Sequence, residues 1–256
     1  MVVIWMLIDT HCHIEHGYYD NLEDIIHDIS KSDVKIIIVS GCDVKSSNNA
    51  VALSHKYNNV YATVGFHPDE CENVSEKDFD NFEKWLNEEK VVGVGEIGLD
   101  YYHNDLNKDK QKALFIKQIE IAKKYNKPIV VHNRAASEDV YNILSKEKVK
   151  GVMHCFTDSN EMALRFTKLG FLLGIGGIIT FKKNNLINVV KELSLDNIVL
   201  ETDSPYLTPE PYRGKKNNPS YLPLIATELA RIKNITYDEV AEKTTSNAYE
   251  MFDFKD

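Results

Sequence analysis

The chain has 256 residues, which is long enough for one large α/β barrel or for two small domains. It carries 30 lysines and arginines against 39 aspartates and glutamates, and the formal net charge of −9 excludes the general basic surface of a protein that coats duplex nucleic acid. Any contact with nucleic acid should therefore be local. No low-complexity tract or long linker divides the sequence, so we expect a single domain over residues 1–256.

The opening residues and the cysteines indicate a reduced, cytoplasmic protein. Residues 1–8 are apolar but lack the basic segment and the cleavage site of a secretory signal, and they are too few to span a membrane. The four cysteines include no C-x-x-C pair. We therefore expect no membrane association, and the sequence indicates no protein partner.

Short apolar, β-branched runs recur along the chain, and segments with helical spacing separate them. The predicted strands cover residues 4–8, 35–40, 60–64, 91–94, 128–131, 151–153, 171–175 and 198–200. The spacing predicts helices between them, such as 108–126, and two further helices near 221–232 and 237–252. This alternation is typical of parallel βαβ units.

Eight such units, complete by about Ser204, predict an α/β fold of the (β/α)₈ TIM barrel type. The alternative is an open, doubly wound sheet. Such a sheet normally has a glycine-rich phosphate loop after its first strand, where this chain has Asp9-Thr10-His11-Cys12-His13.

Polar side chains occupy the ends of the predicted strands, where a barrel of this kind places its catalytic residues. They are His11 and His13 after the first strand, His67 after the third, Glu96 after the fourth, His132 and Arg134 after the fifth, His154 after the sixth, and Glu201 and Asp203 after the eighth. His11 and His13 are two residues apart, so their imidazoles should project from the same face.

Each of these residues taken singly has an ordinary structural role open to it. Glu96 could be a loop acid, and His132 and His154 could be hydrogen-bonded core histidines. Together, however, four imidazoles and two carboxylates would converge on one barrel mouth, where their burial without a cation is unfavourable. Six ligands exceed the three that one catalytic zinc usually takes, so the pattern predicts a two-metal centre with a shared carboxylate.

The chain resembles the TatD-type metal-dependent deoxyribonucleases of the amidohydrolase-like barrel superfamily. The motifs that carry the resemblance are Ile8-Asp9-Thr10-His11-Cys12-His13, Val64-Gly65-Phe66-His67-Pro68, Gly95-Glu96-Ile97-Gly98-Leu99-Asp100-Tyr101, His132-Asn133-Arg134, His154-Cys155-Phe156-Thr157 and Glu201-Thr202-Asp203-Ser204-Pro205-Tyr206-Leu207. The resemblance implies that His11, His13, Glu96 and Asp203 hold one divalent ion, that His132 and His154 hold a second, and that Glu96 bridges the two. It also implies hydrolysis of DNA phosphodiesters, often from a 3′ end.

One position departs from the family pattern. The family commonly has an acidic residue directly after the arginine of the fifth-strand motif, whereas this chain has Ala135. An acid there would favour the positive end of the following helix, and Ser137 is the residue available to cap that helix instead.

The implied chemistry assigns roles to several residues. Two adjacent cations would lower the pKa of a bound water, and Asp203 is the residue expected to orient or deprotonate it, with Glu96 between the ions. Contacts with the substrate phosphate are expected from His67 and Arg134, and from Arg213 and Lys215 in the loop after the eighth strand. That basic loop could equally be a solvated turn.

Three classes of function remain open. The first is a nuclease that acts on the end or a single-stranded part of DNA. The second is a hydrolase of an ester, an amide or a small phosphoester, with deacylation of D-aminoacyl-tRNA between the two. The third is a non-catalytic binding protein, which the intact ligand set disfavours. The ligands suit two divalent ions, and zinc, manganese, iron and magnesium all remain possible.

Overall fold

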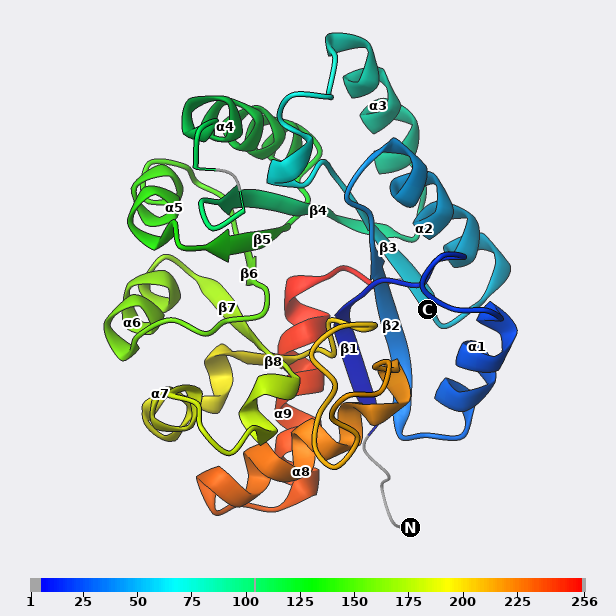
Figure 1. Cartoon of the computed structure of the whole chain (residues 1–256), viewed down its shortest axis with the longest axis vertical. Coiled ribbons are helices and arrows are strands. Elements are labelled where there is room, and N and C mark those ends of the chain that lie inside the picture. Colours follow the sequence, from blue (N-terminus) through cyan, green and yellow to red (C-terminus); the bar gives the residue numbers. More distant parts are fainter. Residues whose placement is uncertain (1–5, 104, 255–256) are drawn as a thin grey trace.

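A computed structural model describes residues 6–103 and 105–254 as a barrel of parallel strands with helices between them (Figure 1). The strands are β1 Leu7–Cys12, β2 Val34–Ser40, β3 Val60–Val64, β4 Val91–Asp100, β5 Ile129–Arg134, β6 Gly151–Met153, β7 Phe171–Ile175 and β8 Ile198–Leu200. The α-helices are α1 Leu22–Ser30, α2 Val44–Lys56, α3 Asp80–Leu86, α4 Lys108–Lys124, α5 Ser137–Leu144, α6 Asn160–Lys168, α7 Leu186–Glu192, α8 Leu222–Lys233 and α9 Tyr237–Met251. The expected (β/α)₈ TIM barrel is thereby confirmed.

The strands pair in chain order, from β1 to β8, and every pair is parallel. The first and last strands are joined by backbone hydrogen bonds between the end of β1 and the residues that follow β8. The His13 amide donates to the Ser204 carbonyl at 2.7 Å, and the Asp203 amide donates to the His11 carbonyl at 3.0 Å. The first and last predicted ligands are therefore tied together by main chain.

Three strands differ from their predicted bounds by more than one residue, and β2 begins one residue earlier than predicted, at Val34. β1 begins at Leu7 and runs through the polar residues to Cys12, because Asp9 and Cys12 pair with β2; residues 4 and 5 of the predicted strand lie outside the described residues. β4 and β5 extend to Asp100 and Arg134, which pair with each other. His11, Glu96, His132 and Arg134 thus lie within strands rather than after them. Parallel pairing continues through polar residues that hydrophobicity does not mark as strand.

Two layers of apolar side chains support the barrel. A large core lies between the strands and the surrounding helices. A smaller core fills the barrel and is completed from α9 and the residue after it. Its members are Ile8, Ile36, Ile38, Tyr61, Val92, Val130, Val152, Val199, Ala248, Met251 and Phe252. Figure 1 shows α9 behind the strands, where it closes one end of the barrel and leaves the other end for polar side chains.

The start of α5 corrects one expectation. The helix begins at Ser137 with Ala136 as its N-cap residue, and no side chain caps it, so the prediction that Ser137 caps this helix is wrong. The Ser137 hydroxyl instead donates to Asp158 in the loop before α6, and it accepts from Asn133 at 3.0 Å. A carboxylate therefore approaches this helix start from a neighbouring loop.

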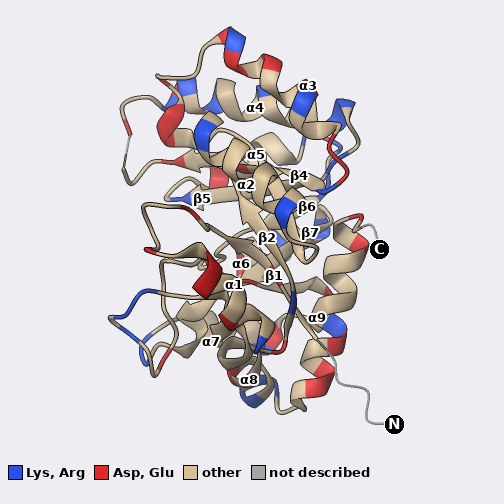
Figure 2. Cartoon of the chain, turned by 90° about the vertical axis from the view of Figure 1, so that its right-hand side faces the viewer, with Lys and Arg blue, Asp and Glu red and all other residues tan. Residues whose placement is uncertain are grey.

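Charged residues of both signs are distributed over the surface. Figure 2 shows acidic and basic residues interspersed along the helices on the face in view, without a continuous basic surface. None of the helices in the described part of the chain is long and apolar enough to cross a membrane.

Candidate metal centre

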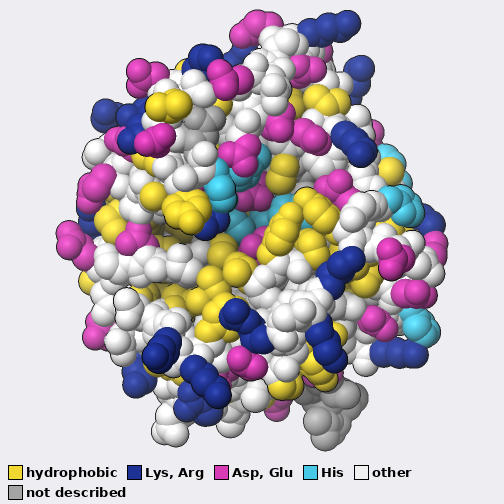
Figure 3. Space-filling view, in the orientation of Figure 1, with side chains coloured by type: hydrophobic (Ala, Val, Ile, Leu, Met, Phe, Trp, Pro, Cys, Tyr) yellow, Lys and Arg dark blue, Asp and Glu magenta, His cyan; other side chains and the backbone are white. Residues whose placement is uncertain are grey.

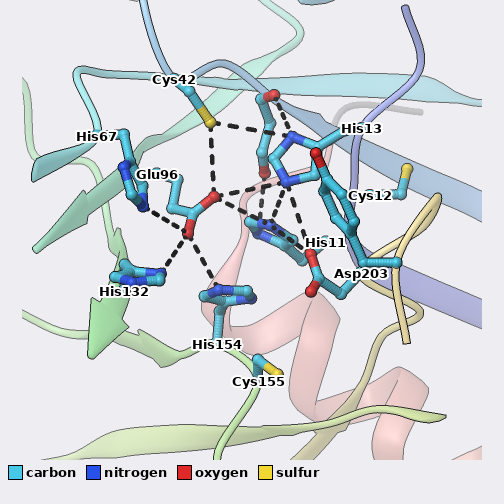
Figure 4. Close-up of polar contacts among 12 residues, drawn as sticks. His11, Cys12, His13, Cys42, His67, Glu96, His132, His154, Cys155 and Asp203 are labelled. Atoms are coloured by element: carbon cyan, nitrogen blue, oxygen red, sulfur yellow. Dashed lines mark hydrogen bonds and ion pairs between the residues drawn. The ribbon is translucent and has the colours of Figure 1, made fainter. Parts of the chain in front are cut away.

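The open end of the barrel holds a compact cluster of imidazoles and carboxylates (Figure 4). In the space-filling view, histidine and acidic side chains lie together in a hollow at the centre of this face (Figure 3). The cluster unites residues from six strands or the loops that follow them: His11, His13, His67, Glu96, His132, His154 and Asp203. The structure thus brings all six predicted metal ligands together, and it adds His67 to them.

Glu96 lies at the centre of the cluster, and its two carboxylate oxygens face different groups of nitrogen atoms. Oε2 is 3.4 Å from His11 Nε2 and 3.5 Å from His13 Nε2. Oε1 is 2.8 Å from His132 Nδ1 and 3.1 Å from His154 Nε2. A side chain in this position can serve two ions at once, one on each oxygen.

Asp203 closes the first of these groups. Its Oδ1 lies 3.7 Å from His11 Nε2 and 3.6 Å from His13 Nε2, and its backbone has a left-handed φ of 52°. The carboxylate is 13% exposed, whereas His11 is fully buried. Asp203 is therefore the acid of the first group that can also contact solvent in the mouth.

The donor set fits divalent cations. His11 Nε2 and His13 Nε2 face each other at 3.1 Å, an approach that two nitrogen lone pairs avoid unless a proton or a cation lies between them. Three sets of side chains have ligand atoms within 4.8 Å of one another: His11, His13 and Glu96; His11, His154 and Asp203; and His67, Glu96 and His132. Imidazole with carboxylate suits zinc, manganese and iron.

The far nitrogen of each ligand histidine also has a neighbour. His11 Nδ1 lies 3.0 Å from Ser40 Oγ, His13 Nδ1 lies 3.2 Å from the Ser40 carbonyl, His132 Nε2 lies 3.1 Å from Asp100 Oδ2, and His154 Nδ1 lies 3.3 Å from Glu201 Oε1. Such neighbours orient an imidazole and select which nitrogen is free to bind a metal. Sequence reasoning missed this role for Ser40 and Asp100, and it noted Glu201 without giving it one.

Asp100 is itself held in place from several sides. Its Oδ1 accepts from the amides of Tyr102 and His103, both at 2.9 Å. The Gln111 side chain on α4 accepts from the Asp100 amide at 2.8 Å and donates to its carbonyl at 2.9 Å. These hydrogen bonds hold in place the carboxylate that orients His132. In the sequence, the only signal for this role was that Asp100 belongs to the motif that begins at Gly95.

Charge in the cluster keeps the carboxylates ionised. Burial would raise the pKa of Glu96, but the charge of His154 and hydrogen bonds with His11 and His132 outweigh burial and hold this pKa well below its ordinary value. Burial would also raise the pKa of Asp203, but the hydrogen bond with His13 helps to hold this pKa below its ordinary value. Both oxygen donors are thus available to a cation at neutral pH.

The residues predicted to contact the substrate phosphate differ in their position: one lies in the cluster and three are exposed outside it. His67 belongs to the cluster itself, since its Nε2 is 3.7 Å from Glu96 Oε1. Arg134 is exposed, and its guanidinium lies 4.2 Å from the centre of the Tyr102 ring. Arg213 and Lys215 are exposed in the loop after β8, outside the cluster.

Comparison with known proteins identifies the family. The family model described as TatD related DNase matches residues 8–253. The chain belongs to the TatD family. It is 42% identical to the metal-dependent hydrolase YabD of Bacillus subtilis, over 96% of this chain and 99% of YabD, and 35% identical to the metal-dependent hydrolase YcfH of Escherichia coli K12, over 96% and 95%.

A solved TatD-family structure matches the fold closely. The crystal structure of YjjV, a TatD homologue from Escherichia coli K12, superposes with a TM-score of 0.93 at 29% identity, covering 99% of this chain and 100% of YjjV. The resemblance drawn from the sequence motifs is therefore confirmed, and the chain is a metal-dependent hydrolase of the TatD family.

Proposed function

We propose that the chain is a deoxyribonuclease that uses two divalent ions to hydrolyse DNA phosphodiester bonds, at a 3′ end or in a single strand. The observation that carries the proposal is the position of the two Glu96 carboxylate oxygens. Oε2 faces His11 and His13, whereas Oε1 faces His132 and His154. Two ions that share one carboxylate in this way would stabilise the attacking and leaving oxygens of a phosphoryl transfer. The description of the matching family model as a DNase supports DNA as the substrate.

The residues of the chain have distinct roles in this proposal. His11, His13, Glu96 and Asp203 hold one ion, and His132, His154 and Glu96 hold the other. Asp203 reaches both the cluster and the open mouth, so it orients the attacking water and accepts its proton. We assign contact with the cleaved phosphate to His67, which lies beside Glu96, and to Arg134 at the end of β5.

The cysteines support the expected cytoplasmic location, which we retain as part of the proposal. All four are free thiols in the structure. Unpaired cysteines are typical of proteins that stay in a reducing compartment.

The first test compares substrates and metals directly. Purified protein, stripped with a chelator and reloaded with zinc, manganese, iron or magnesium, is incubated with end-labelled single- and double-stranded DNA, a D-aminoacyl-tRNA and a simple carboxylic ester. We expect shortening of single-stranded DNA with at least one of these ions and none with chelator present. Turnover of the ester or the aminoacyl-tRNA without any cleavage of DNA would favour the alternative hydrolases.

A second test concerns Arg213 and Lys215, which we propose contact DNA phosphates. Replacing both with alanine is expected to raise KM for oligonucleotides and to flatten the dependence of KM on salt, because fewer counterions are released on binding. Hydrolysis of a small uncharged ester, where it occurs, serves as the control and should be unchanged. An unaltered salt dependence would show that these two residues form a solvated turn.

A further inference from the structure

One imidazole beside the metal centre has no role in the proposed function. His103 lies three residues after the end of β4, in a loop at the mouth of the barrel, and its side chain is 51% exposed. Its Nδ1 lies 2.8 Å from Asp100 Oδ2. Within residues 6–103 and 105–254, no group is hydrogen-bonded to the other ring nitrogen, Nε2. His103 therefore has one nitrogen that is held in place and one that is free.

A buried carboxylate fixes the orientation of this imidazole. Asp100 is 1% exposed, and its Oδ1 accepts from the His103 amide at 2.9 Å while its Oδ2 faces the His103 ring. Burial would raise the pKa of Asp100, but hydrogen bonds with His132 and His103 hold this pKa below its ordinary value. An ionised carboxylate beside Nδ1 keeps a proton on that nitrogen and stabilises the charged imidazolium, so Nε2 is the nitrogen that can exchange a proton with a substrate.

The same carboxylate joins His103 to the metal centre. Asp100 Oδ2 also lies 3.1 Å from Nε2 of the candidate ligand His132. In the loop after β3, the pKa of Asp69 is lowered by its hydrogen bond with His67 and, to a smaller extent, by the charge of His103. His103 therefore lies at the edge of the cluster, on the side that holds His67 and His132.

His132, which shares a carboxylate with His103, lies across Glu96 from the proposed base Asp203. Asp203 approaches the histidines that face Oε2 of Glu96, whereas His132 faces Oε1. Figure 4 shows Asp203 and His132 on opposite sides of the Glu96 carboxylate. In a phosphoryl transfer, the attacking and leaving oxygens lie roughly in line across phosphorus. A base at Asp203 therefore favours a leaving oxygen on the side of His132 and His103.

We propose that His103 is the general acid of the reaction and gives the proton on its Nε2 to the leaving oxygen. A water oxygen forms a bond to phosphorus as Asp203 takes a proton from that water. The bond between phosphorus and the leaving oxygen breaks, its electron pair stays on that oxygen, and the proton from His103 converts the oxygen to a hydroxyl group. Exchange with solvent then returns a proton to His103 and removes one from Asp203. The inference rests on the proposed function and adds the second proton transfer to it.

The test varies the leaving group. Protein reloaded with divalent ions is given a single-stranded oligothymidylate, whose leaving sugar oxygen needs a proton, and nitrophenyl esters of thymidine 5′-phosphate and 3′-phosphate, whose nitrophenolate leaves without one. We expect His103→Gln to lower kcat for the oligonucleotide by about 10²-fold to 10⁴-fold, the usual contribution of a general acid, and to leave kcat for the nitrophenyl esters nearly unchanged. A merely structural defect would lower both values alike.

Further measurements separate acid catalysis from a change in the metal centre. Elemental analysis should show the same metal content in His103→Gln as in the unmodified chain, because His103 is not a ligand. Nitrogen-15 NMR of the metal-free chain should show the proton of neutral His103 on Nδ1, the nitrogen beside Asp100. The control variant His27→Gln removes an exposed histidine from α1 and should hydrolyse all the substrates like the unmodified chain.

Two kinetic results would overturn the inference: an equal loss of kcat for the oligonucleotide and the nitrophenyl esters, or no loss for the oligonucleotide. If His103→Gln cleaves DNA normally, His103 is excluded as the acid and the proposed function stands. If the unmodified chain cleaves no phosphodiester but hydrolyses carboxylic esters, the proposed function fails. His103 is then tested on the alkyl and nitrophenyl esters of one acid, where a loss confined to the alkyl ester would support it and an equal loss would exclude it.

Discussion

The variant Glu96→Ala is expected to fold but to lose most of its divalent metal and its hydrolytic activity. Glu96 is 4% exposed, and it is the side chain whose two oxygens face both groups of histidine nitrogens. Its removal takes an oxygen donor from each proposed ion, so both should bind weakly. Elemental analysis after dialysis measures the metal per chain, and circular dichroism checks the fold.

Two further variants make the result for Glu96 specific. Glu96→Gln keeps the size of the side chain and one carbonyl oxygen, so it should retain more metal than Glu96→Ala. Glu88→Ala removes a surface carboxylate that pairs with His55, and it should keep the metal content of the unmodified chain. If Glu96→Ala retained about two equivalents of metal, the number expected for a two-metal site, Glu96 could not be the bridging ligand.

The variant Asp203→Asn is expected to reduce kcat by about 10²-fold to 10⁴-fold, the usual contribution of a general base. The amide keeps the size and one oxygen ligand of the aspartate but cannot accept the proton of water. Asparagine also tolerates the left-handed φ of 52° at this position, so the backbone should be undisturbed. Steady-state kinetics with matched metal content should show the loss in kcat, with KM little changed.

A control variant separates this chemistry from a defect in the cluster. Asp105→Asn changes an exposed aspartate in the loop before α4 and should keep full turnover. Normal turnover by Asp203→Asn itself, at equal metal content, would remove Asp203 from the proton transfer. If Asp203→Asn only lost metal and kept normal turnover per bound metal, Asp203 would be a metal ligand and not the proton acceptor.

The sequence was sufficient to predict the fold and the clustering of the candidate ligands, because both depend on local patterns. Alternating apolar and helical segments predicted each of the strands, and polar residues near the strand ends predicted the cluster. The ends of β1, β4 and β5 were less predictable. Their last residues are polar, and only pairing with the neighbouring strand makes them part of the sheet, as at Asp100 and Arg134.

The residues that orient the ligands could not be inferred in the same way. Ser40 and His11 are 29 positions apart, and Asp100 and His132 are 32 apart, so no local pattern indicates these contacts. The same reason explains the error at Ser137, whose hydroxyl bonds to Asp158 from another loop. Side-chain contacts between distant segments require the folded structure.

The position of α9 makes the inside of the barrel depend on a helix that follows every candidate ligand in the sequence. Every candidate ligand precedes Ser204, whereas Ala248, Met251 and Phe252 complete the apolar packing inside the barrel. A polypeptide that stopped before α9 would carry the whole ligand set and yet leave Ile38, Val130 and their neighbours open to water. Catalytic competence and aggregation resistance are therefore acquired together, once α9 has been made, and a chain that stops before α9 should be a target for proteolysis rather than a partly active enzyme.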